Sequence, residues 1–358
     1  MNILILGGTG SIGAALVNIL KTTSWNIAVT SRKAKDRVGN VTYIEGNAHE
    51  KMFLTECLHE EKWDAIVDFM AYTTKEFSER YELFLKNTNQ YFFLSSSRVY
   101  AESDSPITEN SARLLDVCGD EEYLKTDEYA LAKARQENLL FASESKNWTI
   151  IRPYKTYNDY RIQLGMFEKE DWLYRVLMGK TLAFPQAVAQ KRTTLTYAED
   201  VAVAIKELIG NPEALGETFH ITTTESITWK DICDEYATVL QRQLNKKMKV
   251  CYVETEDTFY EVWNKYQIMY DCKYDRLFDN SKIDRVTKGQ IKYTKFFDGS
   301  DKCLTKFVSN QEWRSIDWGL QFWMDRVTND KTRLWEVIGF KEKVRYLKAF
   351  INANFLKN

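Results

Sequence analysis

Short apolar runs alternate with amphipathic stretches along the first 155 residues. The runs that predict buried β-strands lie at residues 3–6, 27–30, 41–44, 65–69, 91–94 and 149–151. The stretches that predict helices between them lie at residues 14–21, 77–86 and 130–143. Because parallel strands are joined by crossover helices, this alternation predicts an α/β fold with a doubly wound parallel sheet covered on both faces.

The regular alternation ends after Pro153. Further helices are expected at residues 171–178 and 198–209, and extended segments at 182–185, 193–196 and 218–222. From about residue 226 the chain is aromatic, charged and mostly helical in pattern. We therefore expect a first domain at residues 1–155, onto which residues 193–225 pack back, and a smaller, mainly helical region at residues 156–358.

Composition limits the function classes. The 358 residues suggest about two domains. The 49 Lys and Arg against 51 Asp and Glu exclude a uniformly basic nucleic-acid binder. The balance hides two opposed segments, because residues 102–128 hold nine acidic and two basic residues, whereas the last 28 hold seven basic and two acidic residues.

Neither a metal site nor a membrane span is indicated by the sequence. The six cysteines are scattered without a C-x-x-C pair, and the three histidines lack ligand-like spacing. No run of about 18 uncharged apolar residues occurs, and the apolar start lacks a cationic n-region. We expect a cytoplasmic protein without a bound metal and without a membrane partner.

A glycine-rich loop follows the first predicted strand and precedes the first predicted helix. Its spacing is G-x-x-G-x-x-G, and it predicts a binding site for a dinucleotide pyrophosphate. Glycines allow the tight turn and the close approach of the phosphates, and the helix N-terminus supplies free N–H groups. The candidate cofactor residues of this loop are Gly7, Thr9, Gly10, Ser11, Ile12 and Gly13, which makes residues 1–155 a candidate NAD(P)-binding Rossmann domain.

The end of the second predicted strand bears on the choice of cofactor. It reads Thr30-Ser31-Arg32-Lys33, and no acidic residue precedes Asp36. An acidic residue here would bind the ribose 2′-hydroxyl of NAD, whereas Arg32 suits the 2′-phosphate of NADP. The sequence favours NADP, with NAD as the alternative. The competing interpretation of Arg32 and Lys33 is a pair of solvated loop charges.

Candidate catalytic residues lie on a predicted helix and after a predicted strand. Tyr129 and Lys133 are four residues apart in DEYALAKARQENLL, so they share a helix face. The Lys133 ammonium favours a phenolate on Tyr129, which can then accept or donate a proton. Upstream, the apolar run from Tyr91 ends in three serines before Arg98.

These features together resemble the extended short-chain dehydrogenase/reductase family, and within it the NAD-dependent epimerase/dehydratase group. Further segments match in order: Gly46-Asn47, Phe69-Met70-Ala71, Ile151-Arg152-Pro153, and residues 194–205 with Asp200. The resemblance covers residues 1–225 well and residues 226–358 poorly.

The resemblance implies hydride exchange at a carbon of a sugar, most often a nucleotide-activated one. Tyr129 would exchange the proton, Lys133 would bind the nicotinamide ribose, and Ser96 would orient the substrate. Asn47 would lie near the adenine, and Met70 and Ala71 near the cofactor ribose. The family also implies a homodimer through the helices at residues 77–86 and 130–143.

Some positions depart from the family pattern. Ser97-Arg98 stands where sugar 4,6-dehydratases carry an acidic pair, which favours reduction or 4-epimerisation over dehydration. Residues 154–157 replace the usual Asn-Val-Tyr-Gly. The acidic segment at residues 102–128 is interpreted either as a lid or as a solvated surface loop. Ser97, Arg192 and Arg276 are candidate substrate contacts, with surface ion pairing as the alternative for the two arginines.

Two other functions are carried as alternatives. The segment from WDAIVDFMAYT to SSSRVY also resembles a branch that includes chloroplast stem-loop RNA-binding proteins. The basic C-terminus agrees with nucleic-acid binding as well as with a solvated helix face. A redox regulator that binds NADP without turnover is the third reading. The presence of Ser96, Tyr129 and Lys133 favours the enzyme over both.

Overall fold

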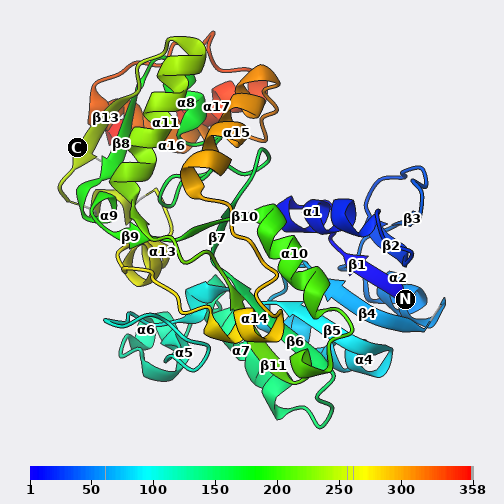
Figure 1. Ribbon diagram of the computed structural model, residues 1–358. Coiled ribbons are helices and arrows are strands. Elements are labelled where there is room, and N and C mark those ends of the chain that lie inside the picture. Colours follow the sequence, from blue (N-terminus) through cyan, green and yellow to red (C-terminus); the bar gives the residue numbers. More distant parts are fainter. Residues whose placement is uncertain (61, 256, 261, 356–358) are drawn as a thin grey trace. The chain divides into compact units, whose positions relative to one another are not determined.

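The computed structural model describes residues 1–60, 62–255, 257–260 and 262–355 (Figure 1). They form two compact units. The first unit contains Met1–Asn158, Thr194–Ser226 and Arg276–Phe296. The second contains Asp159–Thr193, Ile227–Asp275 and the chain from Phe297 onward. The sequence division placed residues 276–296 in the second region, whereas they pack with the first unit.

A parallel sheet of seven strands forms the centre of the first unit, in the order β11-β6-β5-β4-β1-β2-β3. This confirms the predicted doubly wound α/β class. The strands are β1 (Asn2–Leu6), β2 (Asn26–Ser31), β3 (Val41–Glu45), β4 (Trp63–Asp68), β5 (Thr88–Leu94), β6 (Trp148–Pro153) and β11 (Glu217–Ile221). A separate parallel pair consists of β7 (Lys155–Tyr157) and β10 (Leu195–Tyr197).

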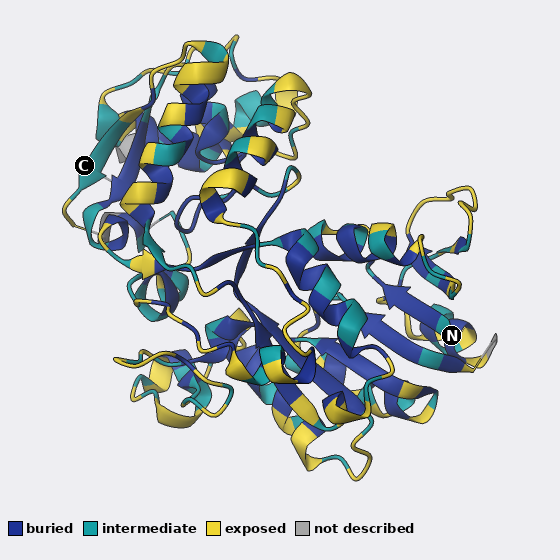
Figure 2. Cartoon of the chain, viewed as in Figure 1, coloured by how far each residue is buried: buried dark blue, intermediate teal, exposed yellow. Residues whose placement is uncertain are grey.

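The central strands are apolar at consecutive positions because both faces of the sheet are covered. Ile3 and Ile5 of β1 point to one core, and Leu4 and Leu6 point to the other. Figure 2 shows the sheet as almost continuously buried. Helices α1 (Ser11–Leu20), α10 (Ala198–Leu208) and α14 (Ser281–Val286) cover the first core. The second core is covered by α2 (Lys51–Glu60), α3 (Thr74–Ser78), α4 (Tyr81–Lys86) and α7 (Tyr129–Ala142).

The predicted helix at residues 77–86 is two short helices, α3 and α4. A capping box between Thr73 and Glu76 starts α3. The break falls at Arg80, which is buried and has φ −136°, ψ −18°. Its guanidinium lies 4.8 Å from the centre of the Tyr72 ring. The sequence pattern also missed α2, which buries Leu54 and Leu58 in the second core.

The second unit combines small sheets with helices. Strand β8 (Thr181–Pro185) pairs in parallel with β13 (Lys249–Val253), and β9 (Arg192–Thr193) pairs antiparallel with β12 (Ile227–Thr228). Its core is aromatic, as in the stacked pair Trp172 and Tyr236, with ring centres 4.9 Å apart. Its longer helices are α11 (Trp229–Leu244), α15 (Phe296–Ser309), α16 (Trp318–Thr328) and α17 (Phe340–Phe355).

Shorter elements complete both units. In the first unit they are α5 (Leu114–Val117), α6 (Glu121–Leu124) and the 3₁₀ turns η1 (Ser97–Val99) and η2 (Pro212–Ala214). In the second they are α8 (Leu173–Leu177), α9 (Gln186–Ala189), α12 (Asp257–Tyr260), α13 (Lys265–Gln267) and the π-helical turn η3 (Ile268–Cys272). Among the described residues, no helix has the length and apolar character needed to cross a membrane.

Candidate active site

The glycine loop joins β1 to α1 in the predicted geometry. Gly7 has φ +71°, a conformation that side chains disfavour. A side chain at Gly13 would place its Cβ 2.8 Å from Cα of Gly8, so this glycine lets the helix approach the strand. Gly10 caps α1 without a side-chain hydrogen bond, and within the described chain the buried Oγ of Ser11 has no hydrogen-bond partner. The helix N-terminus is therefore available to an anionic ligand.

A cavity of about 220 Å³ lies against this loop. It includes five of the predicted cofactor residues, namely Gly7, Thr9, Arg32, Asn47 and Met70. Its other lining residues are Thr30, Ser31, Gly46, Ala48 and His49. Glycine backbone, a helix N-terminus with an unused hydroxyl and one arginine at the rim fit the phosphates and adenosine of a dinucleotide.

The remaining predicted cofactor residues lie around this cavity or farther along the sheet edge. Gly10, Ser11, Ile12 and Gly13 form the end of the loop and the first turn of α1. Ala71 follows β4 and is exposed. The Arg32 side chain is also exposed, directly after β2.

The three serines after β5 have different contacts. Ser95 Oγ donates to Glu137 Oε1 at 2.6 Å, and Ser97 Oγ donates to the carbonyl of Arg152 at 2.8 Å. Ser96 Oγ accepts from the backbone N–H of Arg98 at 3.2 Å. Within the described chain no acceptor engages the Ser96 hydroxyl hydrogen. The turn thus fixes Ser96 and leaves its hydroxyl hydrogen able to donate to a substrate, whereas Ser97 connects the turn to β6 by a hydrogen bond.

Tyr129 is the first residue of α7, and its side chain is 42% exposed. The guanidinium of Arg98 lies 5.2 Å from the centre of its ring. Arg98 is itself fixed by a 2.7 Å ion pair with Glu128. The phenol therefore lies at an accessible surface next to a positioned cation.

Lys133 lies one turn further along α7 and is buried. Its Nζ donates to the carbonyl of Leu94 at 2.7 Å, two residues before Ser96. Burial lowers the pKa of Lys133 to about 8, although the nearby carboxylates of Asp68 and Glu137 oppose that shift. The structure thus links the Tyr129 helix to the end of the serine-bearing strand through one ammonium group.

Asp68 at the end of β4 is the first acid near Lys133. It accepts hydrogen bonds from Tyr91 Oη at 2.8 Å and from the backbone of Met70 at 2.9 Å. Burial raises the pKa of Asp68 to about 6, against these hydrogen bonds and the charge of Lys133. An acid with a raised pKa next to a lysine with a lowered pKa, both near neutral pH, is typical of functional sites.

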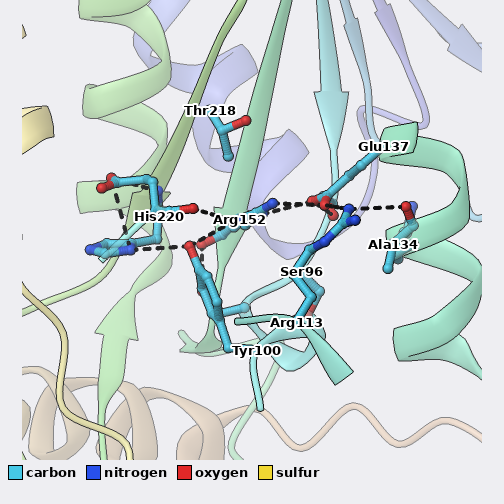
Figure 3. Close-up of polar contacts among 12 residues, drawn as sticks. Ser96, Tyr100, Arg113, Ala134, Glu137, Arg152, Thr218 and His220 are labelled. Carbon is cyan, nitrogen blue, oxygen red and sulfur yellow. Dashed lines mark hydrogen bonds and ion pairs between the residues drawn. The ribbon is translucent and has the colours of Figure 1, made fainter. Parts of the chain in front are cut away.

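Glu137 is the second acid, one turn beyond Lys133 on the same helix. Its carboxylate accepts two hydrogen bonds from Arg152, each of 2.7 Å, and one of 3.1 Å from Arg113 (Figure 3). With the bond from Ser95, this buried carboxylate joins α7, β5, β6 and the segment before α5. Its charge is fully compensated, as buried carboxylates require.

The network continues from Arg152 towards β11. Arg152 Nη1 donates to Tyr100 Oη at 2.9 Å, and that hydroxyl lies 3.4 Å from His220 Nδ1. His220 Nε2 lies 2.8 Å from the carbonyl oxygen of Asp279. Burial lowers the pKa of His220, so the imidazole is neutral at pH 7. Figure 3 shows Arg152 between Glu137 and Tyr100.

The predicted substrate contacts lie in different surroundings. Arg276 is fully buried in the first unit, where it donates to the carbonyls of Tyr100 and Ala101 at 3.2 Å. Arg192 belongs to the second unit and is exposed. Ser97 is fully buried. The substrate contacts of all three stay predictions.

The acidic segment at residues 102–128 packs against the first unit. Arg113 binds Glu137 and Asp116, and Asp127 accepts from Thr74 Oγ1 at 2.6 Å. The carboxylate of Glu109 accepts from the backbone N–H of His220 at 3.2 Å. These tertiary contacts distinguish the segment from a solvated surface loop.

Sequence reasoning missed Asp68, Tyr91, Glu137 and His49. A signal existed for Glu137, because it continues the four-residue spacing of Tyr129 and Lys133 along one helix face. Asp68 ends an otherwise apolar strand, which is also an unusual place for a carboxylate. No sequence signal identifies Tyr91 or His49.

Comparison with known families agrees with this geometry. The family model described as the RmlD substrate binding domain matches residues 1–258, more than two thirds of the chain. The chain belongs to this family, within the extended short-chain dehydrogenases/reductases. The family assignment from the glycine loop, serine turn and Tyr129/Lys133 pair is thereby confirmed.

Two curated relatives differ in what their names describe. The chloroplast stem-loop binding protein of 41 kDa b from Arabidopsis thaliana is 27% identical over 63% of this chain, and the chain covers 60% of that protein. The 2′-dehydrokanamycin reductase from Streptomyces kanamyceticus is 20% identical over 80% of this chain and 79% of its own length.

Solved structures share the fold. The dTDP-glucose 4,6-dehydratase of Bacillus anthracis, solved in complex with NAD, has a TM-score of 0.67 and 17% identity. The match covers 87% of this chain and 98% of that one.

Proposed function

We propose that this protein is a nicotinamide-dinucleotide-dependent oxidoreductase or epimerase that acts at a carbon of a sugar, most simply of a nucleotide-activated sugar. The observation that carries the proposal is the placement of Tyr129, Lys133 and Ser96. An accessible phenol, a buried ammonium one turn later and a held hydroxyl at the adjoining strand end are the groups that proton transfer at a hydroxyl or carbonyl requires.

Tyr129 exchanges the proton with the substrate oxygen. Its exposure lets the substrate reach the phenol, and the Arg98 guanidinium over its ring places positive charge beside the reacting group. Ser96 donates to the same substrate oxygen and fixes its position, because its Oγ is already oriented by the Arg98 N–H.

Lys133 positions the nicotinamide ribose and holds a proton near neutral pH. Asp68 and Glu137 keep its ammonium in the buried site by partly offsetting the cost of burial. They are positioning residues, since they act through Lys133 and the strand ends rather than on the substrate.

The glycine loop and its cavity hold the other end of the cofactor. The bound dinucleotide supplies or accepts the hydride. Gly7, Thr9 and the α1 N-terminus with Gly10, Ser11, Ile12 and Gly13 would bind the pyrophosphate, and Asn47, Met70 and Ala71 the adenosine and ribose. Arg32 at the cavity rim favours NADP, because a guanidinium can bind the 2′-phosphate.

Within this class, reduction or epimerisation is favoured over dehydration. Elimination of water needs an acid and a base directly after the catalytic serine. The two residues after Ser96 are Ser97, which is buried, and Arg98, which is paired with Glu128, so neither can serve as the acid or the base. Arg192 and Arg276 are proposed phosphate contacts, which Arg276 can make only if its carbonyl contacts open. A homodimer and a cytoplasmic location remain predictions of the sequence.

The test is a screen of nucleotide sugars with NADPH and with NADH, followed by cofactor absorbance and product stereochemistry together. We expect turnover of at least one sugar. A reductase would oxidise the cofactor in the net reaction, whereas an epimerase would change the stereochemistry of the sugar without net oxidation of the cofactor. Binding of either cofactor without any sugar turnover would instead support a redox regulator.

Cofactor choice is tested separately with Arg32→Asp. The variant should lose about tenfold to a hundredfold of its NADPH affinity relative to NADH, because the charge facing the 2′-phosphate is reversed. Lys33→Asp is the neighbouring control. An unchanged preference would remove Arg32 from the cofactor site.

RNA binding is the second candidate, favoured by the 27% identity with the chloroplast stem-loop binding protein. Its test is electrophoretic mobility of a stem-loop RNA over a range of salt concentrations. Tight, salt-sensitive binding together with no sugar turnover would reverse the ranking.

A further inference from the structure

The C-terminal helix α17 and the turn before it expose large apolar side chains. Trp335 is 72% exposed, Ile338 79% and Phe340 84%. Leu347 and Ile351 on the helix are 39% and 48% exposed. We call these five residues the terminal apolar stripe. Single exposed apolar residues are ordinary, but five within 17 positions of one segment are not.

The stripe faces away from the core of its own unit. Tyr346 and Ala349 of α17 pack with Trp318 and Phe322 of α16. Phe340, Leu347 and Ile351 follow the spacing i, i+7 and i+11, which places them in one row on the side of the helix away from Ala349. Leu347 also lines a cavity of about 710 Å³ together with Tyr346 and Phe322. Helix α17 is thus apolar on two opposite sides, whereas a helix at a protein surface normally presents a polar outer face.

Positive charges flank the stripe. Lys341, Lys343 and Lys348 lie on α17, and the 28 residues from 331 carry seven basic residues against two acidic ones. Both acids have ion-pair partners, because Glu336 binds Lys180 at 3.2 Å and Glu342 binds Arg345 at 2.9 Å. The segment therefore presents a net positive surface around an apolar centre.

We propose that this surface binds peripherally to an anionic lipid membrane, with the terminal apolar stripe entering the boundary between headgroups and acyl chains. Helices that lie in this boundary combine Trp, Phe and Leu on one side with Lys and Arg beside them, as here. Attraction between the lysines and lipid phosphates, and burial of the stripe, act together.

Two other occupants fit the same residues less well. A second copy of the chain would bring two surfaces into contact, each with a surplus of four positive charges over residues 331–355. Single-stranded nucleic acid matches the charge, and bases could stack on Trp335 and Phe340, but the aliphatic Ile338, Leu347 and Ile351 would stay exposed to water. The inference does not depend on the proposed catalytic function.

The proposal revises one expectation from the sequence. A membrane partner was not expected because no spanning segment was found, and the described chain indeed has no helix suited to span. A helix that lies in the membrane surface does not have to be long enough to cross the membrane. Such a helix is identified by apolar residues that stay exposed in the folded unit.

The experiment is co-sedimentation of the full chain with vesicles of phosphatidylcholine alone and of phosphatidylcholine mixed with phosphatidylglycerol. We expect binding to the anionic vesicles that weakens as salt rises, and little binding to the neutral ones. The double variant Ile338→Ser, Phe340→Ser should lose roughly tenfold to a hundredfold in vesicle affinity, because two large side chains no longer leave water.

Matched variants separate the two contributions. The double variant Lys341→Gln, Lys348→Gln should weaken binding to anionic vesicles and leave the little binding to neutral vesicles unchanged. Met52→Ser is the control for apolar loss, because Met52 is 79% exposed on α2, and Lys51→Gln is the control for charge. All variants should unfold at the wild-type temperature, which shows that lost binding is not lost folding.

Three outcomes would overturn the proposal. These are no binding of the wild type to anionic vesicles, equal loss of binding in Met52→Ser and in the stripe variant, and concentration-dependent self-association that the stripe variant abolishes. The last would assign the surface to a second copy. Binding to an RNA oligonucleotide with none to vesicles would likewise assign it elsewhere.

Discussion

Helices α7 and α17 depart from the amphipathic pattern in opposite ways. Helix α7 buries Lys133, Gln136 and Glu137, whereas α17 exposes Phe340, Leu347 and Ile351. Buried charge costs free energy unless it is paired, and exposed apolar area costs free energy in water. Each helix thus carries a cost that folding alone does not explain, and each cost lies where we infer a function.

The comparison also separates two kinds of site. The polar groups of α7 are fixed by several partners each, as with Glu137 and its bonds to Ser95, Arg113 and Arg152. The terminal apolar stripe is held by few contacts, such as that of the Arg333 guanidinium 5.0 Å from the centre of the Trp335 ring, and we infer that it serves a surface outside the chain. Rigid positioning suits catalysis, and a protruding apolar face suits association.

The largest effect is expected for Tyr129→Phe at the start of α7. Turnover should fall about 10²- to 10⁴-fold because the proton donor and acceptor is lost, while cofactor affinity is retained. Steady-state kinetics and cofactor titration measure the two effects. Tyr81→Phe on α4 serves as the control and should keep full activity. Turnover retained by Tyr129→Phe would contradict the mechanism.

Removing the carboxylate of Glu137 tests whether the buried charge of α7 is structural. Glu137→Ala should lower the free energy of unfolding by about 3–5 kcal/mol, because the guanidiniums of Arg152 and Arg113 lose a buried partner. Urea denaturation measures this. Glu144→Ala, at an exposed position after α7, should cost almost nothing. Equal stabilities of the two variants would show that the network is not needed for folding.

Lys133→Met should abolish turnover and yet stabilise the fold by about 1–3 kcal/mol at pH 7, since a buried ammonium is replaced by an apolar side chain. The folded-state pKa of Lys133 is about 8, below its ordinary 10.5. Between these values the unfolded chain binds the proton and the folded chain does not, so wild-type stability rises with pH. The advantage of the variant should therefore shrink from pH 8 to pH 10.

A lower stability of Lys133→Met than of the wild type at pH 7 would contradict this view of α7. Denaturation curves at pH 7, 8.5 and 10 show whether Lys133→Met stabilises or destabilises the fold. A pH-independent difference would show that protonation of Lys133 is not linked to folding.

The smallest effect is expected for Leu347→Ser on the exposed side of α17. It should change the free energy of unfolding by less than about 0.5 kcal/mol, whereas its neighbour Tyr346→Ala should cost about 3 kcal/mol through loss of buried ring contacts. Thermal denaturation compares the two. A large cost for Leu347→Ser would mean that the stripe is part of the folded core.

The local pattern of the chain predicted much of the fold and where several candidate site residues lie along it. Apolar runs located the six N-terminal strands, and the glycine spacing located the turn before α1. The four-residue spacing of Tyr129 and Lys133 placed them on one helix. These features depend on strand and helix periodicity and on backbone conformation, which are properties of neighbouring residues.

Long-range packing decided the rest. Only the folded sheet brings Asp68 near Lys133 and joins Glu137 to Arg152. It also places Tyr100 Oη beside His220 and buries Arg276 against the carbonyls of Tyr100 and Ala101. In α17 the sequence set the apolar and basic positions, but packing on α16 decided which apolar side is covered. A residue's pattern limits its local conformation, whereas burial and partners depend on segments far away in the chain, which tertiary structure alone brings together.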